Sequence, residues 1–135
     1  SLISETQHVI VQKFIKNVKI GDKRILLING LPVGAVNRVP VNNEIRANLH
    51  IGGRAKKTNL TKREKFICNK IKYKLREKGL FFTGIDVIDG YLTEINVTSP
   101  TCIREIDSLN KVNISYIYWE EALQLRNHRA NIFSS

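Results

Sequence analysis

Short apolar runs alternate with polar turn residues along most of the chain, and two longer stretches repeat apolar residues with helical spacing. The short runs are rich in Val, Ile and Phe, which favours β-strands. We expect strands over residues 8–15, 23–28, 33–39, 81–88 and 91–97. We expect helices over residues 62–78 and 113–127. At 135 residues, the chain has the length of a single domain with one core.

The first predicted helix has clear start and stop signals. Thr61 and Glu64 form a capping box, in which each side chain accepts a hydrogen bond from a backbone N–H group at the helix start. Gly79 suits the C-terminal stop, because glycine adopts the left-handed conformation without strain. The apolar face expected against the sheet consists of Ile67, Ile71 and Leu75. The lysines then face outward, as in a solvated helix, with a nucleic-acid-binding face as the alternative.

The last predicted helix begins at Asn113, a residue type that caps helix N-termini. Its inner face is marked by Ile114, Tyr118, Ala122 and Leu125. Trp119 then lies on a neighbouring face, where it is either partly exposed or in a subunit contact. Residues 126–135 are polar, and we expect them to be loosely ordered.

A hairpin is predicted around Asp89-Gly90, a dipeptide that favours tight turns. The length of the turn decides which residues pair. A two-residue turn would pair Asp86 with Thr93, whereas a three-residue turn over residues 89–91 would pair Asp86 with Glu94. We predict the three-residue turn.

With that turn, Asp86, Glu94 and Asn96 share one face, because residues two apart in a strand point the same way. Two carboxylates and a carboxamide form a cluster of hard oxygens, which suits Mg²⁺ that also holds phosphate. Solvated carboxylates on an exposed hairpin are the alternative that spacing alone leaves open.

The hairpin expected over residues 23–39 turns at Asn29-Gly30-Leu31-Pro32. Arg24 lies near the start of its first strand and Arg38 near the end of its second. Both therefore lie at the open end of the hairpin. Their planar guanidinium groups suit phosphate or carboxylate, and a solvated strand end is the alternative.

Residues 39–54 show no sustained period, and we interpret them as a long loop. Gly52-Gly53 gives hinge freedom and free backbone N–H groups, and Arg46 and Arg54 add positive charge. Such a loop could act as a lid that closes over a reacting phosphate and excludes water. A plain surface loop is the alternative.

The composition and charge of the chain limit the kinds of protein and binding site to consider. The formal net charge of +10 suits nucleic acid or an anionic surface, but the basic residues are scattered along the chain. Cys68 and Cys102 have no metal-ligand spacing and form no disulfide framework, which suits the reducing cytoplasm. The three histidines lie far apart and give no zinc signature. No apolar run reaches the roughly 20 residues of a membrane span, and no signal peptide opens the sequence.

Several segments resemble bacterial glutathione synthetases, members of the ATP-grasp ligase family, in matching order from Val9 to Leu123. The longest segment is Thr93–Glu105, which reads TEINVTSPTCIRE. The others are Gly21–Arg24, Pro32–Val36 followed by Arg38 and Pro40, Glu44–Arg46, Asn48-Leu49 and Gly52–Arg54. The resemblance implies an α+β fold, in which an antiparallel sheet with packed helices forms the C-terminal lobe of an ATP-grasp enzyme.

The resemblance also implies an ATP site and a metal site. It makes the strand over residues 8–15 the hinge between the two ATP-grasp lobes. The residues implied in ATP binding are Gln12, Lys13, Phe14, Ile15, Asp22 and Arg24, of which the first four would line the adenine pocket. The implied ligands of Mg²⁺, with Mn²⁺ as an alternative ion, are Asp86, Glu94 and Asn96.

Catalytic and substrate residues follow from the same resemblance. The arginines implied in stabilising the transferring phosphoryl group or closing the lid are Arg24, Arg38, Arg46 and Arg54. The residues implied in substrate binding are Arg38, Thr98, Ser99 and Pro100. Cys102 has no base at an interpretable spacing, so we assign it no catalytic role.

The implied activity is that of a glutathione synthase. ATP would phosphorylate the carboxylate of γ-glutamylcysteine, and glycine would displace the phosphate from the acyl phosphate. The implied partners are therefore ATP, γ-glutamylcysteine and glycine, in a cytoplasmic homo-oligomer that does not bind a membrane. In the family, the other ATP-grasp lobe precedes the hinge. We therefore expect this chain to be a C-terminal fragment that needs the N-terminal part, in cis or in trans, and is inactive alone.

Two other classes stay open. Another ATP-grasp carboxylate–amine ligase would share the metal-binding residues but would join different substrates. A basic nucleic-acid-binding module would bind with an affinity that falls steeply as salt rises. Nucleic acid is the less favoured partner, because no recognition motif accompanies the charge.

Overall fold

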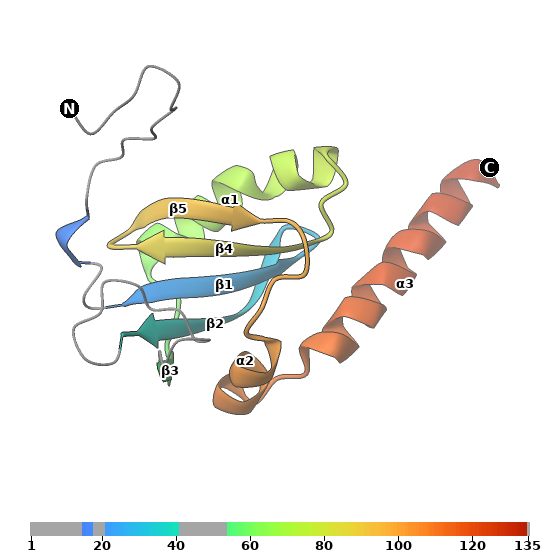
Figure 1. Cartoon of the computed structure of the whole chain (residues 1–135). Helices are drawn as coiled ribbons and strands as arrows, with labels where there is room; N and C mark the ends of the chain where they lie inside the picture. The colour runs from blue at the N-terminus through green and yellow to red at the C-terminus, as the bar shows by residue number, and fades with distance from the viewer. Residues whose placement is uncertain (1–14, 18–20, 41–53, 135) are drawn as a thin grey trace, which may run out of the picture.

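The computed structural model describes residues 15–17, 21–40 and 54–134, which form a five-stranded antiparallel sheet with helices on both faces (Figure 1). The strands are β1 (Asp22–Ile28), β2 (Leu31–Val39), β3 (Arg54–Lys57), β4 (Phe82–Ile88) and β5 (Tyr91–Asn96), in the order β3-β2-β1-β4-β5. The helices are α1 (Lys62–Glu77), α2 (Ile103–Asn110) and α3 (Ile114–Phe133). The antiparallel α+β architecture implied by the resemblance is confirmed.

Helix α1 covers one face of the sheet. Both halves of its capping box are present: the Glu64 N–H donates to Thr61 Oγ1 (3.2 Å), and the Thr61 N–H donates to Glu64 Oε2 (2.7 Å). Alternation along the strands directs every second side chain of β1 and β4 toward α1. The resulting core consists of Ile25, Leu27, Ala35, Ile67, Cys68, Leu75, Ile85 and Val87.

Helix α2 and the start of α3 pack on the opposite face. The core there consists of Leu26, Ile28, Val36, Cys102, Ile106 and Ile114. Asn110 Nδ2 donates to the backbone oxygen of Ala35 (3.0 Å), which ties the end of α2 to β2. Tyr118 packs edge-on against Phe81, with ring centroids 5.1 Å apart. Beyond this contact, α3 leads away from the sheet (Figure 1).

The β1–β2 and β4–β5 hairpins share one geometry. Each turns through two residues with positive φ, Asn29-Gly30 (50° and 74°) and Asp89-Gly90 (51° and 74°), as type I′ turns require. Each second strand then contains a bulge after two cross-strand pairs, which leaves Val33 in β2 and Thr93 in β5 without an opposite residue.

The bulge at Thr93 corrects one prediction and confirms another. The turn has two residues, so the predicted three-residue turn over residues 89–91 is wrong. Asp86 nevertheless pairs with Glu94, as predicted, because the bulge in β5 supplies the extra residue. The Thr93 hydroxyl donates to the backbone oxygen of Asp86 (3.1 Å), which holds the bulge in place.

Other boundaries also differ from the sequence predictions. The long loop predicted up to residue 54 gives way there to β3, an edge strand that pairs with β2. The short helix α2 is not predicted, because its N-cap, Cys102, makes no capping side-chain hydrogen bond. Helix α3 continues to Phe133 instead of loosening after residue 125, since its second half contains good helix formers such as Ala, Leu and Arg.

The predicted hinge strand and most of the predicted lid loop lie outside the described residues. Ile15, the last residue of that strand, precedes a short 3₁₀ segment at Lys16 and Asn17 and is not itself in a strand. Among the described residues, no helix combines the length and apolar character that a membrane span requires.

Candidate active site

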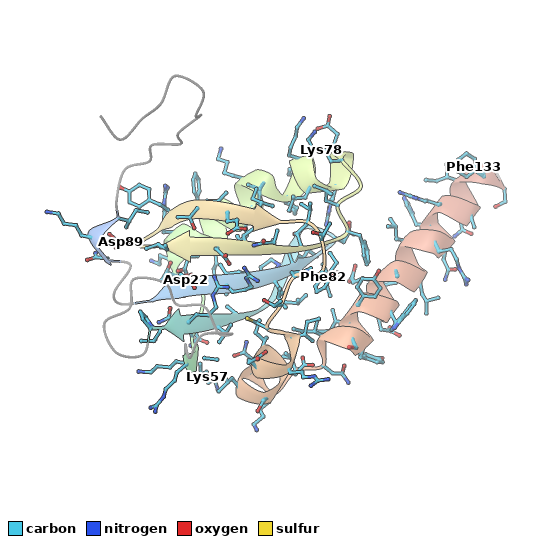
Figure 2. All side chains as sticks on the ribbon, in the orientation of Figure 1. Asp22, Lys57, Lys78, Phe82, Asp89 and Phe133 are labelled. Atoms are coloured by element: carbon cyan, nitrogen blue, oxygen red, sulfur yellow. The ribbon has the colours of Figure 1, made fainter. Side chains whose placement is uncertain are left out.

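One end of the sheet carries polar side chains on the face where α2 packs. They are Asp22, Arg24, Arg38, Asp86, Glu94 and Asn96. The register explains the grouping: Asp22 lies opposite Arg38, and Arg24 lies opposite Asp86, which in turn lies opposite Glu94. Directly opposed residues share a face. Figure 2 shows Asp22 at this end of the sheet and Phe82 at the other end.

Arg24 and Asp86 form the centre of this cluster. Arg24 Nε donates to Asp86 Oδ1 (2.8 Å) and Arg24 Nη2 donates to Asp86 Oδ2 (2.7 Å), which is a bidentate pair. The two side chains are only 8% and 7% exposed. Arg24 Nη1 also donates to Thr101 Oγ1 (2.8 Å), so three of its nitrogens have fixed partners. The guanidinium is therefore held rigidly from both sides.

Arg38 extends the network along β2. Its Nη2 donates to Asp86 Oδ2 (2.9 Å), and its Nε donates to Asp22 Oδ1. Asp86 thus lies between two guanidinium groups. Within the described part of the chain, Nη1 of Arg38 has no hydrogen-bond partner.

The charges shift the pKa values of the two aspartates in opposite directions. Burial alone would raise the pKa of Asp86, but Arg24 and Arg38 outweigh burial and lower it, so Asp86 stays ionised. Burial raises the pKa of Asp22 above 3.8, because the hydrogen bond and charge of Arg38 compensate for burial only in part. Burial alone would lower the pKa of Arg38, but Asp22 and Asp86 outweigh burial and raise it.

Glu94 and Asn96 form the outer part of the cluster. When the Asn96 amide is oriented to satisfy both neighbours, its nitrogen donates to Glu94 Oε1 (2.8 Å) and its oxygen accepts from Arg24 Nη2 (3.0 Å). Glu94 is exposed, whereas Asp86 and Arg24 are buried. The three predicted metal ligands are therefore adjacent, and Asn96 links Glu94 to the buried ion pair.

The oxygen atoms of this cluster fit a hard cation in part. Asp86 Oδ1 accepts one hydrogen bond and Oδ2 accepts two, so Oδ1 keeps a lone pair. Glu94 Oε2 has no hydrogen-bond partner among the residues the structure describes. Carboxylate and amide oxygens are the ligands that Mg²⁺ prefers, together with water and phosphate oxygens. In the described ranges, no group of three or more His, Cys, Asp and Glu side chains could hold a metal ion by itself, so an ion here would need further oxygens from Asn96, water or phosphate.

The turn after β5 contributes differently from its predicted role. Thr98 and Ser99 are exposed, and Ser99 has a positive φ of 44°. Pro100 is buried against Gly84, where an added Cβ would lie 2.8 Å from the proline Cβ. This contact places Thr101 next to Arg24. The contact of Thr101 with Arg24 is not predicted from the sequence, although Gly84 carries a signal of the packing, because a glycine within a strand marks a close approach.

The remaining predicted site residues lie elsewhere or outside the described part. Arg54 is exposed on the edge strand β3, opposite Val39, and has no ion-pair partner among the described residues. Ile15 is half-buried. Gln12, Lys13, Phe14 and Arg46 lie outside the described residues.

Comparison with protein families gives one match over most of the chain. The model described as "Prokaryotic glutathione synthetase, ATP-grasp domain" matches residues 1–111. Similar curated proteins carry the name glutathione synthetase. The protein from Synechococcus elongatus is 58% identical over 106 residues, which cover 78% of this chain and 33% of that protein. The protein from Mesorhizobium japonicum is 54% identical over 111 residues, which cover 82% of this chain and 36% of that protein.

A third relative, from Synechocystis sp., is 53% identical over 122 residues, which cover 86% of this chain and 38% of that protein. The chain thus spans between a third and two fifths of the length of these three relatives.

Among solved structures, a D-alanine–D-alanine ligase from Bacillus anthracis, complexed with ATP, is similar with a TM-score of 0.53. The similarity covers 87% of this chain and 42% of the ligase chain, at 16% sequence identity, and it shows the fold alone. The family match and the relatives carry the assignment. The chain belongs to the prokaryotic glutathione synthetase family, whose ATP-grasp domain model matches residues 1–111.

Proposed function

We propose that this chain provides the phosphate- and metal-binding part of an ATP-grasp active site that joins glycine to γ-glutamylcysteine. The observation that carries the proposal is the buried Arg24–Asp86–Arg38 network beside Glu94 and Asn96. In a chain that is more than half identical to glutathione synthetases, such a cluster supports ATP-dependent ligation through an acyl phosphate.

The arginines would act by position and charge. Phosphoryl transfer depends mainly on aligning the reacting groups and on neutralising the negative charge of the phosphates. Asp86 fixes Arg24 and Arg38 in advance, so little reorganisation is needed when an anion arrives. Arg38, whose Nη1 has no partner among the described residues, would approach the transferring phosphoryl group or the peptide carboxylate, and Arg24 would lie near the phosphates of ATP.

Asp86, Glu94 and Asn96 would hold Mg²⁺, or Mn²⁺ in its place. The ion would neutralise phosphate charge in the bound nucleotide. Glu94 supports this role because it is exposed and has an oxygen without a partner among the described residues, whereas Asp86 is already shared by two arginines. Arg24 keeps the Asn96 amide oxygen turned toward the cluster.

The other site assignments remain part of this proposal. Gln12, Lys13, Phe14 and Ile15 would line the adenine pocket, and Asp22 would position Arg38 through their ion pair. Arg46 and Arg54 would close over the phosphates, and Thr98, Ser99 and Pro100 would lie near the peptide substrate. A cytoplasmic location suits a reaction that consumes ATP, and both cysteines are free thiols.

The test is a chimera in which this chain replaces the corresponding segment of the Synechocystis glutathione synthetase. We expect ATP hydrolysis that requires both γ-glutamylcysteine and glycine, measured as phosphate release. The unaltered Synechocystis enzyme is the positive control, and circular dichroism establishes that the chimera is folded. A folded chimera without substrate-dependent phosphate release would falsify the proposal.

A substrate panel separates this activity from the alternatives. A different carboxylate–amine ligase would release phosphate with another pair of substrates, such as two D-alanines, and not with γ-glutamylcysteine and glycine. A nucleic-acid-binding module would bind RNA or DNA with an affinity that falls steeply with salt, with or without ATP. We expect neither result.

A further inference from the structure

A cavity of about 600 Å³ lies at the end of the sheet away from the candidate active site. Its wall is formed by the Asn29 turn, the end of α1, the segment just before β4 and one side of α3. Figure 2 shows Phe82, at the start of β4, at the opposite end of the sheet from Asp22. The cavity is therefore separate from the Arg24–Asp86 cluster.

The floor of this cavity is apolar. Helix α3 provides Tyr118, Ala122 and Leu125, which lie on one helix face because they are spaced at about one and two turns. The segment before β4 provides Leu80 and Phe81. The Phe81 and Tyr118 rings meet edge-on, with centroids 5.1 Å apart, so the aromatic part of the floor is packed.

Three arginines from two helices surround this floor: Arg76 of α1 and Arg126 and Arg129 of α3. Among the residues that the structure describes, no acidic side chain lines the cavity. Over the described ranges, none of the three arginines forms a salt bridge, although other basic residues such as Lys23 and Lys74 do. Arg76 Nε donates to the backbone oxygen of Asn29 (2.8 Å), which fixes this guanidinium and leaves its terminal nitrogens for another partner.

Guanidinium groups without a described carboxylate partner, placed around an apolar floor, match a specific kind of ligand. The floor would bury an aromatic body, and arginines form short, charge-assisted hydrogen bonds with phosphate or carboxylate. The volume lies within the roughly 300–1,000 Å³ range of small-molecule sites. We propose that this cavity binds a small organic anion, with an aromatic body on Tyr118 and Phe81 and a phosphate or carboxylate among the three arginines.

This site does not depend on the proposed ligase activity. Its residues differ from those of the phosphate- and metal-binding cluster, and it lies at the other end of the sheet. A ligand there would not compete with nucleotide. Its effect on the active site would pass along strands such as β1 and β2, which run from the Asn29 turn to the candidate active site.

The test uses this chain with 1-naphthyl phosphate as the probe, followed by amide NMR shifts at roughly physiological salt. We expect saturable shifts in Phe81, Tyr118 and their neighbours. Inorganic phosphate and 1-naphthol, which each carry half of the required chemistry, should bind at least about tenfold more weakly. 1-Naphthoate distinguishes a carboxylate preference from a phosphate preference.

The decisive variant is Arg126→Glu/Arg129→Glu, which should weaken binding of 1-naphthyl phosphate by roughly tenfold or more. The matched control is Lys62→Glu/Arg104→Glu, which changes the net charge equally at exposed positions outside the cavity. The control should bind as the unaltered chain does. The proposal is overturned if 1-naphthyl phosphate gives no saturable shifts, or if the two double variants lose affinity equally. Circular dichroism establishes that both variants are folded.

Discussion

The two hairpins of the sheet have the same turn, the same bulge and the same register, yet they position different chemistry. In β1–β2 the pair next to the bulge is Leu26 and Gly34, and in β4–β5 it is Asp86 and Glu94. Both pairs face the side of the sheet where α2 packs. The shared backbone fixes where a pair points, and the residue types decide what it does there.

The neighbours of the two pairs explain why one belongs to the apolar core and the other to a polar cluster. Gly34 lies under α2 so closely that an added Cβ would be 2.4 Å from Ile106 Cγ2. Leu26 is fully buried in the same core. Asp86 instead meets Arg24 and Arg38, and Glu94 is exposed. One bulged hairpin therefore forms part of the core, and the other presents carboxylates to a polar cluster.

The largest expected loss of stability comes from truncating the residue that the first strand contributes to each pair, Asp86 in β4 or Leu26 in β1. Asp86→Ala should lower the free energy of unfolding by about 3–5 kcal/mol, because it leaves Arg24 and Arg38 buried without their carboxylate. Leu26→Ala should cost about 2–5 kcal/mol through a cavity. Urea unfolding measures both. A loss below about 1 kcal/mol for Asp86→Ala would show that the ion-pair network is not structurally important.

The residues that the second strands contribute to the two pairs, Gly34 in β2 and Glu94 in β5, should differ in their effect on stability. Gly34→Ala should destabilise the fold by about 1–3 kcal/mol, because the new methyl group overlaps Ile106 and either α2 or β2 must shift. Glu94→Ala should change stability by no more than about 0.5 kcal/mol, since Glu94 is exposed. Thermal unfolding compares the two. Equal losses would contradict the view that only the first hairpin is closed over by a helix.

Because the Asn29-Gly30 and Asp89-Gly90 turns have the same backbone geometry, the same substitution in each should cost a similar amount of stability. Asn29→Ala and Asp89→Ala should each cost about 1–2 kcal/mol, because alanine is strained at a φ near 50°. Asn29→Gly and Asp89→Gly should lose less, since glycine tolerates that conformation. Urea midpoints measure all four variants. If only one alanine variant were destabilised, the two turns would not be equivalent.

The stability contributed by Asp86 should also depend on pH, whereas the Leu26–Gly34 pair has no titratable group. The folded-state pKa of Asp86 lies below 3.8, so its contribution to stability is present above pH 3.8 and is lost as the pH falls through the lowered pKa. Asp22 acts in the opposite sense, because its folded-state pKa lies above 3.8 and its protonation stabilises the fold as the pH falls toward 3.8.

Unfolding free energies measured between neutral and acid pH test these signs. Asp86→Asn should flatten the acid loss of stability, Asp22→Asn should steepen it, and Leu26→Ala should leave its shape unchanged. An unchanged acid profile in Asp86→Asn would contradict the assigned pKa shift.

Much of the fold follows from local sequence signals. The capping box at Thr61 and Glu64, the Asp89-Gly90 turn and the helical spacing of Ile67, Ile71 and Leu75 all depend on neighbouring residues, so a reading of the chain finds them. The bulge at Thr93 depends on cross-strand pairing, which the sequence does not show, so the sequence predicts a longer turn instead. Both the predicted turn and the observed bulge pair Asp86 with Glu94.

The site is less predictable than the fold. The grouping of Asp86, Glu94 and Asn96 follows from strand alternation, but the double ion pairing of Asp86 requires knowing that β1 lies between β2 and β4. The role of Thr101 depends on how Pro100 packs on Gly84. Strand order and packing across the sheet are long-range features that no local pattern records.

The most direct test of the account compares Glu94→Gln with Glu77→Gln in the Synechocystis chimera. Glu77 is 67% exposed and pairs only with Lys74 among the described residues, so it serves as the control carboxylate. We predict that Glu94→Gln lowers glycine- and γ-glutamylcysteine-dependent phosphate release on the order of a hundredfold, with an unchanged melting temperature. Glu77→Gln should retain full activity. Full activity in the folded Glu94→Gln chimera would contradict the assignment of this hairpin to the active site.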